Sequence, residues 1–521
     1  MTGQYFVAID AGTGSVRCVL FGSDGAEVCA ASRDWTHLAE EGVPGSMAFQ
    51  VDRNFDLILD IVREVVGRSN VPKKEIVAIS ATSMREGFAL VDAGGREIWA
   101  CANVDARANE EVALLKVNPD TERYLYETSG QTFALAAQPR LLWLARHQPE
   151  ILHRASKMVM LSEWVLLRLA GVVVMEPTNG STSGLLSLKT RKAEDSLLTA
   201  CSLPSGLVPD VVEPGTPLGR ILPAVAHATG LDPMTIVVAG GGDTQLAALG
   251  TGVSDPGQSL IVGGTFWQEV VNIPQPMTDA EMRVRVNAAA LPDQWQAEAI
   301  AFHVGTAVRW FRDTFADSER HIARERGVAT LDVLGEEAAS IPIGSLGVIP
   351  IFSDVMNYAR WRHAAPSFLQ LPLDFPGETT RAAMYRSLLE NAAIVAGSNL
   401  GLVAEFSGLT ADTVVFAGGC AKSGLWSQIL ADVLGVAVQV PTVKEATSQG
   451  AAICAATGQG MFGSLAEGSR AWVSWDRRFE PNLEATERYA VVKDRWRRAY
   501  APQLALVDEG VTESLWRAPG A

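Results

Sequence analysis

A strand, a short glycine turn and a second strand occur twice in the chain, about half its length apart. The first unit runs from the apolar residues 5–9 through a turn to the apolar residues 16–21. The second runs from 260–262 through a turn to 266–273. Short apolar runs bounded by glycine are typical of buried strands. The repetition predicts two large α/β domains of related topology with a cleft between them.

The first 80 residues predict how such a domain begins. A hairpin turn after the second strand leads to a third expected strand at 26–32. Apolar residues at i, i+3 and i+4 spacing indicate a helix at 54–67. A short strand is expected at 76–79. The predicted order is therefore three strands, a helix and a further strand.

The residues 249–258 are rich in glycine and proline and predict a hinge. The chain has 521 residues, which at roughly 100–200 residues per domain allows two to four domains. Because the hinge separates the two strand–turn–strand units, we expect one domain over 1–250 and a second over 251–521.

Charge narrows the range of partners. The chain has 43 Lys and Arg against 59 Asp and Glu, a net charge of −16. So acidic a balance argues against nucleic acid or an anionic membrane as the main partner. It leaves room for a phosphorylated small molecule, since backbone N–H groups and a metal ion can hold phosphate without a basic patch. No motif indicates a regulatory protein partner or a homodimer.

The cysteines predict a reducing compartment. None of the six forms a C-x-x-C pair, and most lie in apolar runs, as buried free thiols of a cytoplasmic protein do. They are Cys18, Cys29, Cys101, Cys201, Cys420 and Cys454. The N-terminus has no basic and apolar regions of a signal peptide, and no run of about 18 apolar residues predicts a membrane span.

The turn Asp10–Gly14 follows the first buried strand directly. Asp10 is then expected at the carboxyl edge of the sheet, where α/β ligand clefts form. Its carboxylate could hold Mg²⁺ through water, while Gly12, Thr13 and Gly14 present donors to a phosphate. A plain hairpin with an Asx-turn is the open alternative. A dinucleotide-binding fingerprint is excluded because a third glycine is missing and a strand, not a helix, follows.

A second carboxylate lies on a glycine turn between a strand at 236–239 and a helix at 244–249. Asp243 ends that turn and could act as a general base toward a substrate hydroxyl. It could equally be only the N-cap of the helix. A similar strand, turn and helix occur at 414–434, where Gly418 and Gly419 would let a ligand approach the backbone.

Two further polar segments follow predicted strands. Arg85 and Glu86 could donate to and accept from a polyol or carbonyl ligand, and Asn103 and Asp105 form a similar pair. For both segments a solvated loop is the alternative. His303 and His363 lie near these segments, and such histidines are more often structural.

Together these segments resemble the FGGY family of carbohydrate kinases. The markers in chain order are Asp10–Arg17, Gly241–Asp243, Gly264–Thr265, and Ala417–Gly419 with the later Glu445–Ala452. The resemblance spans nearly the whole chain. It implies two ribonuclease H-like domains of the actin, hexokinase and Hsp70 ATPase superfamily, folded around a central cleft.

The resemblance also implies the activity, an ATP-dependent phosphorylation of a small-molecule hydroxyl with ATP and Mg²⁺. It makes Asp243 the base, and Asp10 and Asp243 the carboxylates for the metal ion. The implied ATP-binding residues are Gly12, Thr13, Gly14, Gly264, Thr265, Gly305, Gly418, Gly419 and Ser423. The implied substrate-binding residues are Arg85, Glu86, Asn103, Asp105 and Gln245.

One departure from the family bears on the substrate. Sugar kinases of the family typically carry Trp-x-Asp-x-Arg where this chain has Asn103–Arg107. Loss of that tryptophan fits a small hydrated dione better than a cyclic or long-chain sugar. A kinase of another small polyol (a pentulose, a tetrulose or glycerol) is the alternative. A non-enzymatic sensor on the same scaffold is disfavoured, because a sensor needs neither Asp10 nor Asp243.

Overall fold

The first half of the chain is built on a six-stranded sheet. The computed structural model describes residues 3–360, 362–375 and 377–515. The strands, in spatial order, are β3 (Glu27–Asp34), β2 (Ser15–Gly22), β1 (Tyr5–Ala11), β4 (Ile76–Ser83), β9 (Ile236–Gly242) and β8 (Pro217–Arg220). β1 pairs antiparallel with β2 and parallel with β4, and β4 pairs parallel with β9. The three predicted N-terminal strands and the strand at 76–79 are confirmed.

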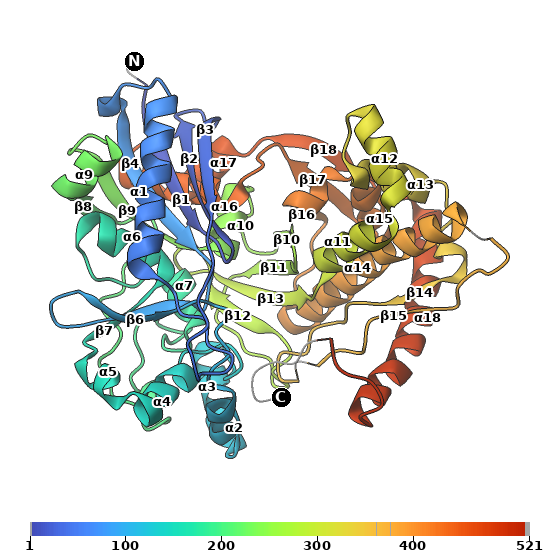
Figure 1. Ribbon diagram of the computed structural model, residues 1–521, viewed down its shortest axis with the longest axis horizontal. Helices are drawn as coiled ribbons and strands as arrows, with labels where there is room; N and C mark the ends of the chain where they lie inside the picture. The colour runs from blue at the N-terminus through green and yellow to red at the C-terminus, as the bar shows by residue number, and fades with distance from the viewer. Residues whose placement is uncertain (1–2, 361, 376, 516–521) are drawn as a thin grey trace.

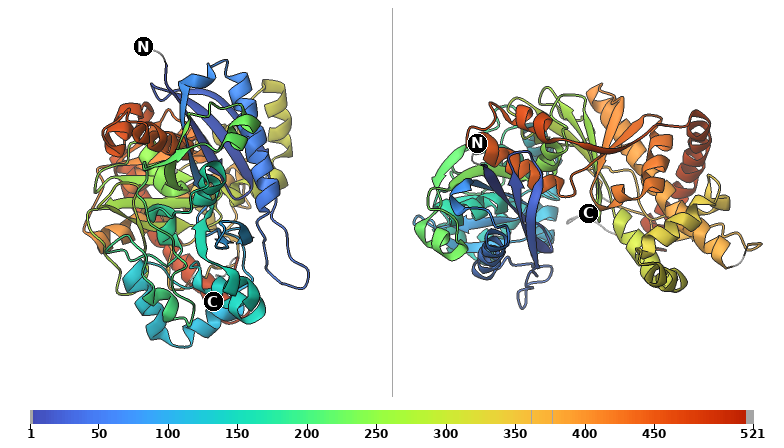
Figure 2. Two further views of the ribbon diagram at one scale, coloured as in Figure 1. Left: turned by 90° about the vertical axis from the view of Figure 1, so that its left-hand side faces the viewer. Right: turned by 90° about the horizontal axis from the view of Figure 1, so that it is seen from above.

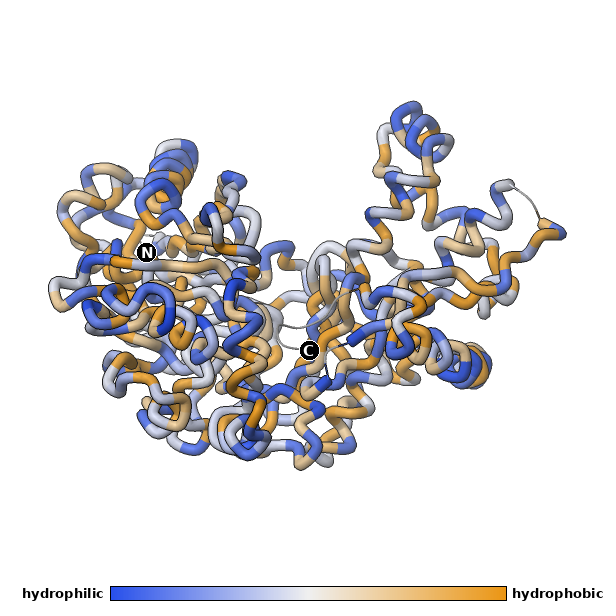
Figure 3. Tube along the Cα trace, turned by 60° about the horizontal axis from the view of Figure 1, so that its bottom comes forward, coloured by the Kyte–Doolittle hydropathy of each residue, from blue (hydrophilic) through white to orange (hydrophobic). Residues whose placement is uncertain are grey.

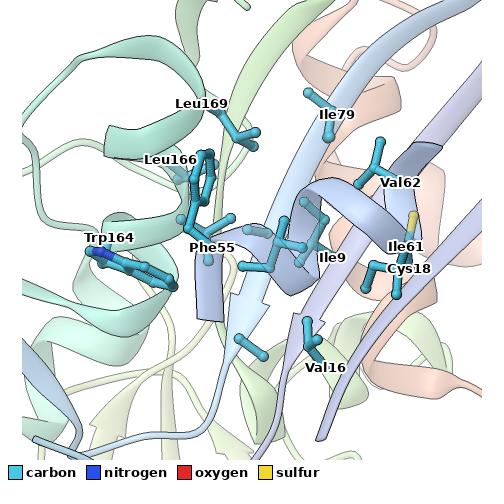
Figure 4. Packing of buried hydrophobic residues seen from close by; sticks show 14 of the residues in the cluster. Ile9, Val16, Cys18, Phe55, Ile61, Val62, Ile79, Trp164, Leu166 and Leu169 are labelled. Atoms are coloured by element: carbon cyan, nitrogen blue, oxygen red, sulfur yellow. The ribbon is translucent and has the colours of Figure 1, made fainter. Parts of the chain in front are cut away.

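Helices α1 (Val51–Arg68) and α6 (Leu161–Ala170) cover one face of this sheet (Figure 1). The predicted helix is confirmed because its apolar positions fall on one side, and that side is buried. Figure 4 shows Phe55 of α1 between Trp164 of α6 and Ile9 of β1. The two aromatic rings meet edge to face with centroids 6.3 Å apart, a favourable geometry for buried rings.

The other face of the first sheet is covered by helices that come from the second half of the chain. α16 (Ala446–Gly458) packs on β1, β4 and β9, and α17 (Leu465–Trp472) lies beside it (Figure 2). Their apolar side chains form one buried cluster with Phe6 and Val19 of the sheet. The segment 446–472 thus packs on the first sheet although it comes after most strands of the second sheet in the sequence.

A smaller unit extends from the first sheet and has its own apolar core. Its three strands lie in the order β6 (Glu97–Cys101), β5 (Phe88–Val91), β7 (Lys157–Met160). Around them lie α2 (Asn109–Lys116), α3 (Pro119–Ser129), α4 (Gln138–His147), α5 (Pro149–Arg154) and α8 (Ser196–Thr199). Helix α7 (Pro177–Thr182) contacts β9 and β12, and α9 (Pro223–Thr229) packs on α1. This unit carries Arg85, Glu86 and Asn103 at its border with the first sheet.

The second half contains a seven-stranded sheet. Its order is β12 (Arg285–Ala288), β13 (Trp295–Ala301), β11 (Trp267–Ile273), β10 (Ser259–Gly263), β16 (Thr413–Ala417), β17 (Ala437–Pro441), β18 (Trp475–Phe479). The helices are α11 (Val304–Phe315), α12 (Asp317–Arg326), α13 (Thr330–Ala339), α14 (Glu378–Ser407), α15 (Gly424–Leu434) and α18 (Leu483–Asp508). Outside this sheet, the short strands β14 (Ile349–Ile351) and β15 (Ser367–Leu369) pair antiparallel with each other. β10 pairs antiparallel with β11 and parallel with β16, as β1 pairs with β2 and β4.

The two halves form two lobes joined near the middle of the molecule (Figure 3). Their matching strand order is the predicted related topology, and the predicted strands and helices near both glycine turns are present. A boundary near residue 250 stays a prediction. The six cysteines are free.

Helix α14 is long and apolar enough to cross a membrane by length and composition, although no long uninterrupted apolar run was found in the sequence. Most of its apolar window is buried in the protein. It packs along β13 and β11 and against α15, so its apolar surface is explained by the core of the second half.

Helices α10 (Asp243–Gly250) and α16 cross at two glycines. A Cβ atom on Gly450 would lie 2.0 Å from the carbonyl oxygen of Leu246, and one on Gly250 would lie 2.1 Å from that of Ala446. Only glycine allows backbones to approach so closely. This crossing anchors the start of the hinge to the segment that covers the first sheet.

We therefore expect Gly450→Ala to lower the free energy of unfolding by about 1–3 kcal/mol, the usual cost of overpacking. Gly335→Ala is the matched control, because Gly335 lies in α13 with nothing within 4 Å of the added carbon. That change should stabilise by about 0.5–1 kcal/mol. Thermal unfolding of both variants tests this, and a Gly450→Ala protein as stable as the wild type would contradict it.

Candidate active site

A cavity of about 690 Å³ lies between the two halves. Thr13, Gly14 and Asp243 line it from the first half, and Thr265 and Arg285 line it from the second. The predicted site residues along its wall are Thr13, Gly14, Arg85, Glu86, Asn103, Asp105, Asp243 and Thr265. The structure thus brings both glycine turns and the candidate base to a single cavity.

Three glycines at the end of β9 place Asp243 at this wall. A Cβ atom on Gly240 would lie 1.9 Å from the carbonyl oxygen of Ala81, and one on Gly241 would lie 2.4 Å from Oγ1 of Thr178. The N–H of Gly242 donates to that same hydroxyl oxygen at 2.8 Å. The glycines therefore let β9 lie directly against β4 and α7, and Asp243 follows as the first residue of α10.

The carboxylate of Asp243 is both held and accessible. Its Oδ1 accepts from the N–H of Thr244 at 2.6 Å and lies 3.3 Å from Nε of Arg85. Its side chain keeps 37% exposure at the cavity. Burial raises the pKa of Asp243 above its ordinary value, and the Arg85 guanidinium opposes this rise. A partly desolvated carboxylate with a raised pKa is suited to accept a proton.

Asp10 is the penultimate residue of β1, next to the first glycine turn. Burial, followed by the charges of Asp243 and Glu445, raises the pKa of Asp10 to about 7, and Arg17 opposes them. Arg17 forms an ion pair with Glu445, the residue before α16. Facing carboxylates of this kind are the donors that Mg²⁺ uses together with water and phosphate oxygens. The described residues contain no cluster of three or more His, Cys, Asp or Glu side chains that could hold a metal ion.

Two ion pairs connect the halves beside Asp243. Nη1 and Nη2 of Arg85 lie 2.5 Å and 2.8 Å from the two carboxylate oxygens of Glu298, and Nη1 of Arg285 lies 2.7 Å from Oε1 of Glu86. Burial raises the pKa of Glu298, but Arg85 outweighs it, so the net shift is downward. Bidentate pairs of this type are strong and geometrically specific. Arg85 is therefore fixed between Glu298 and Asp243.

The predicted substrate residues Asn103, Asp105 and Gln245 have different surroundings. Nδ2 of Asn103 donates to Oγ1 of Thr13 at 3.0 Å, which ties the first glycine turn to the small unit. The buried carboxylate of Asp105 pairs with Arg107 at 2.8 Å and accepts from the N–H of Met47 at 2.6 Å. Gln245 is fully buried in α10, and neither of its side-chain polar atoms has a hydrogen-bond partner.

The second glycine turn lies against the start of α11. A Cβ atom on Gly305 would lie 2.2 Å from the carbonyl oxygen of Gly264, and the N–H of Gly305 donates to the carbonyl of Thr265 at 3.0 Å. Nη2 of Arg309 donates to Oγ1 of Thr265 at 3.1 Å. A helix N-terminus with an arginine beside a glycine turn favours an anionic ligand.

The third predicted nucleotide segment follows β16. Gly418 has a φ of 88°, and a Cβ atom there would lie 2.6 Å from the carbonyl oxygen of Gly263. Oγ of Ser423 accepts from the N–H of Trp426 and caps α15. Gly418, Gly419 and Ser423 lie outside the cavity lining, as do Asp10, Gly12, Gly264, Gly305 and Gln245.

Neither predicted histidine lines the cavity. Burial lowers the pKa of His303, and burial together with His303 lowers that of His363 to about 4. Both rings are therefore neutral near pH 7 and pack with Phe302. This environment agrees with the structural role that is more common for such histidines.

Sequence reasoning missed Arg285, Glu298 and Thr178. Arg285 and Glu298 lie on strands with no recognisable motif, and Thr178 lies on the short helix α7. The available signal was the presence of charged residues in strands that are otherwise apolar or small, since such charges are rarely buried unless paired. The partners of Arg285 and Glu298 could not be read from the sequence because they lie about 200 residues away, and Gly242, the partner of Thr178, lies 64 residues away.

Comparison with known proteins gives one consistent result. Residues 5–250 match the N-terminal domain, and residues 261–458 the C-terminal domain, of the FGGY family of carbohydrate kinases. The autoinducer-2 kinase of Yersinia enterocolitica serotype O:8 is 47% identical over 521 residues, covering 100% of this chain and 98% of that protein. The autoinducer-2 kinase of Salmonella typhimurium strain LT2 is 48% identical with the same coverage.

Solved structures agree in fold. The xylulose kinase of Lactobacillus acidophilus has a TM-score of 0.85 at 19% identity, covering 98% of this chain and 100% of that chain. The xylulose kinase of Rhodospirillum rubrum has a TM-score of 0.83 at 22% identity, with the same coverage. At such identities the likeness concerns the fold alone, and it confirms the predicted actin- and hexokinase-like architecture.

The raised pKa of Asp10 links folding to pH in the metal-free protein. Between the ordinary value of 3.8 and about 7, the folded state keeps a proton that the unfolded chain has released. The free energy of unfolding therefore falls as the pH rises through this range. Asp10→Asn should flatten this fall and should unfold at a higher temperature than the wild type at pH 8.

Thermal unfolding in a chelator at pH 5, 6, 7 and 8 measures the effect. Asp24→Asn, at an exposed hairpin turn whose carboxylate accepts only from the N–H of Ala26, is the matched control and should follow the wild type. Parallel curves for the wild type and Asp10→Asn would contradict the assignment of this titration to Asp10.

Proposed function

The chain belongs to the FGGY family of carbohydrate kinases, and we propose that it phosphorylates the quorum-sensing signal autoinducer-2. This activity gives its relatives of 47% and 48% identity their name. The substrate is the open form of 4,5-dihydroxypentane-2,3-dione, and the phosphoryl group goes to its C5 hydroxyl. As a kinase of this family the protein uses ATP as the phosphoryl donor.

The observation that carries the proposal is the position of Asp243. It lies on the wall of the cavity that Thr13 and Gly14 line from one half and Thr265 from the other. A hydroxyl bound in this cavity would therefore meet Asp243 and the turn at Thr13 and Gly14 from one half, and the turn at Thr265 from the other. Phosphoryl transfer requires mainly this positioning, together with neutralisation of charge.

The reaction assigns a role to each group. Asp243 accepts the proton of the C5 hydroxyl as that oxygen forms its bond to the γ-phosphorus. The bond from the γ-phosphorus to the oxygen that bridges the β- and γ-phosphates breaks, and its electron pair leaves with ADP. Arg85 and Glu86 donate to and accept from the substrate oxygens. Closure of the halves around the cavity would exclude water and limit hydrolysis of ATP.

The remaining predicted residues hold the nucleotide. Gly12, Thr13 and Gly14 face the phosphates from the first half, and Gly264, Thr265 and Gly305 from the second. Gly418, Gly419 and Ser423 line the adenosine side. Asp10 and Asp243 would hold Mg²⁺, which, when bound, neutralises charge on the phosphate oxygens. Asn103, Asp105 and Gln245 complete the substrate side. The six free cysteines support a cytoplasmic location.

Removal of the base tests the mechanism. Asp243→Asn keeps the shape and the hydrogen bond from Thr244 but cannot accept the proton. We expect kcat to fall by about 10²–10⁴-fold, the usual contribution of a general base, with ATP binding largely retained. Asp476→Asn, an exposed carboxylate on β18, is the control. Turnover near the wild-type value in Asp243→Asn would exclude its role as the base.

A substrate panel tests the named substrate. ADP release is measured with the dione, xylulose, ribulose, erythrulose and glycerol, and kcat/KM is compared. We expect the highest value for the dione, since Asn103 stands where sugar kinases of the family typically have tryptophan. A higher value for any other compound would replace the substrate and leave the kinase assignment in place. No phosphoryl transfer to any of them would count against the kinase itself.

A further inference from the structure

Arg285 lies on β12, the edge strand of the second sheet, and its side chain reaches the cavity. This edge docks against the first half of the chain. Nε2 of Gln131 donates to the carbonyl of Val286 at 3.0 Å, and the N–H of Ala288 donates to Oγ of Ser181 at 3.1 Å. The strand is thus held from both halves, so Arg285 has a fixed position.

The guanidinium of Arg285 is fully buried but not fully paired. Nε donates to Oε1 of Gln131 at 2.8 Å, and Nη1 lies 2.7 Å from Oε1 of Glu86. Nη2 is buried and has no hydrogen-bond partner. Buried polar groups are nearly always paired, and a charged donor without an acceptor is costly. A ligand in the cavity that supplies an acceptor would satisfy the unpaired Nη2 donor of Arg285.

The charges around Arg285 indicate which kind of acceptor fits. Burial lowers the pKa of Arg285, but Tyr358, Glu86 and Glu298 outweigh this effect and the neighbouring charge of Arg85, so the net shift is upward. The neighbouring Arg85 is likewise opposed by Glu298 and Asp243. Since the positive charges are already balanced, a further anion would gain little there. A neutral carbonyl or hydroxyl oxygen is the better match for Nη2.

The groups also have an order along the cavity wall. Asp243 contacts Arg85, Arg85 pairs with Glu298, and Arg285 pairs with Glu86, the residue next to Arg85. Arg85 thus contacts the base directly, whereas Arg285 pairs with the residue next to Arg85. A substrate whose terminal hydroxyl meets Asp243 would extend its other oxygens toward Arg285.

We propose that Arg285 is a substrate-contacting residue, whose Nη2 donates to the carbonyl oxygen, or the hydrated carbonyl oxygen, at the end of the substrate remote from the phosphorylated hydroxyl. This inference rests on the proposed function, because it takes the substrate to carry such an oxygen. It makes Arg285 a determinant of specificity for oxo compounds over simple diols, with Glu86 and Gln131 holding the guanidinium in place.

The test compares two ligands that share the terminal diol. Dissociation constants of 4,5-dihydroxypentane-2,3-dione and of pentane-1,2-diol, which lacks both carbonyl oxygens, are measured by calorimetry for the wild type and Arg285→Gln. We expect the variant to bind the dione about 10- to 100-fold more weakly, the effect of losing one hydrogen bond from a charged group. Its affinity for the diol should change less than about threefold.

Arg283→Gln is the matched control. Arg283 lies two residues away, pairs with Asp279 at 2.9 Å, and does not line the cavity. Its variant should bind both ligands as the wild type does. Arg285→Lys, which keeps the charge, provides a second variant if Arg285→Gln unfolds, and it should lose dione affinity selectively as well.

An equal loss for both ligands, or no loss for the dione, would overturn the proposal, because it would mean that Arg285 only supports the fold. If the substrate panel selects another compound, the same comparison is made between that compound and its analogue without the carbonyl oxygen. A failure of the named substrate and a failure of the Arg285 contact are therefore separate results.

Discussion

The bidentate pair between Arg85 and Glu298 is the contact on which the site depends. The two residues are 213 positions apart in the sequence, and both side chains are buried. A guanidinium that is held at two atoms cannot rotate freely, so its third nitrogen stays 3.3 Å from Asp243. Removal of either partner would leave an uncompensated buried charge. The geometry of the base is therefore set by a strand of the other half, and the cavity exists in this form only while the halves are together.

A second constraint comes from helix α16. It covers the first sheet although it follows the second sheet in the chain, and it crosses α10 at Gly250 and Gly450 with almost no space between the backbones. Glu445, just before α16, pairs with Arg17 and adds to the field that raises the pKa of Asp10. The same short segment thus fixes the hinge, completes a core and influences the electrostatics of the first glycine turn. A shift of α10 would move Asp243, because Asp243 is the first residue of that helix.

The parts of the site that were predictable from the sequence are local. Asp10 lies at the end of a buried strand and precedes a glycine-containing turn, and Asp243 follows a buried strand that ends in three glycines. Such features depend on neighbours within a few residues. The position of Arg285 was not predictable, because it depends on contacts with Glu86 and Gln131, which belong to another unit of the fold. The environment of Asp105 was also hidden, since its pairing with the backbone of Met47 is a long-range contact. The packing of α16 on the first sheet was not predictable either, because the apolar pattern of a helix does not indicate which sheet the helix covers.

The local charge of the site explains how an acidic protein can bind a polyanion. Around the base and its neighbours, the carboxylates of Asp10, Glu86, Asp243, Glu298 and Glu445 face the three guanidinium groups of Arg17, Arg85 and Arg285. When all five carboxylates are ionised, the negative charge exceeds the positive by two. Burial is the main cause of the raised pKa of Asp10, and the charges of Asp243 and Glu445 add to it. Free ATP would be repelled by such a cluster, whereas a complex of ATP with a divalent cation brings the charge that the cluster lacks. A net charge of −16 is therefore compatible with ATP as a substrate, provided that positive charge accompanies the phosphates.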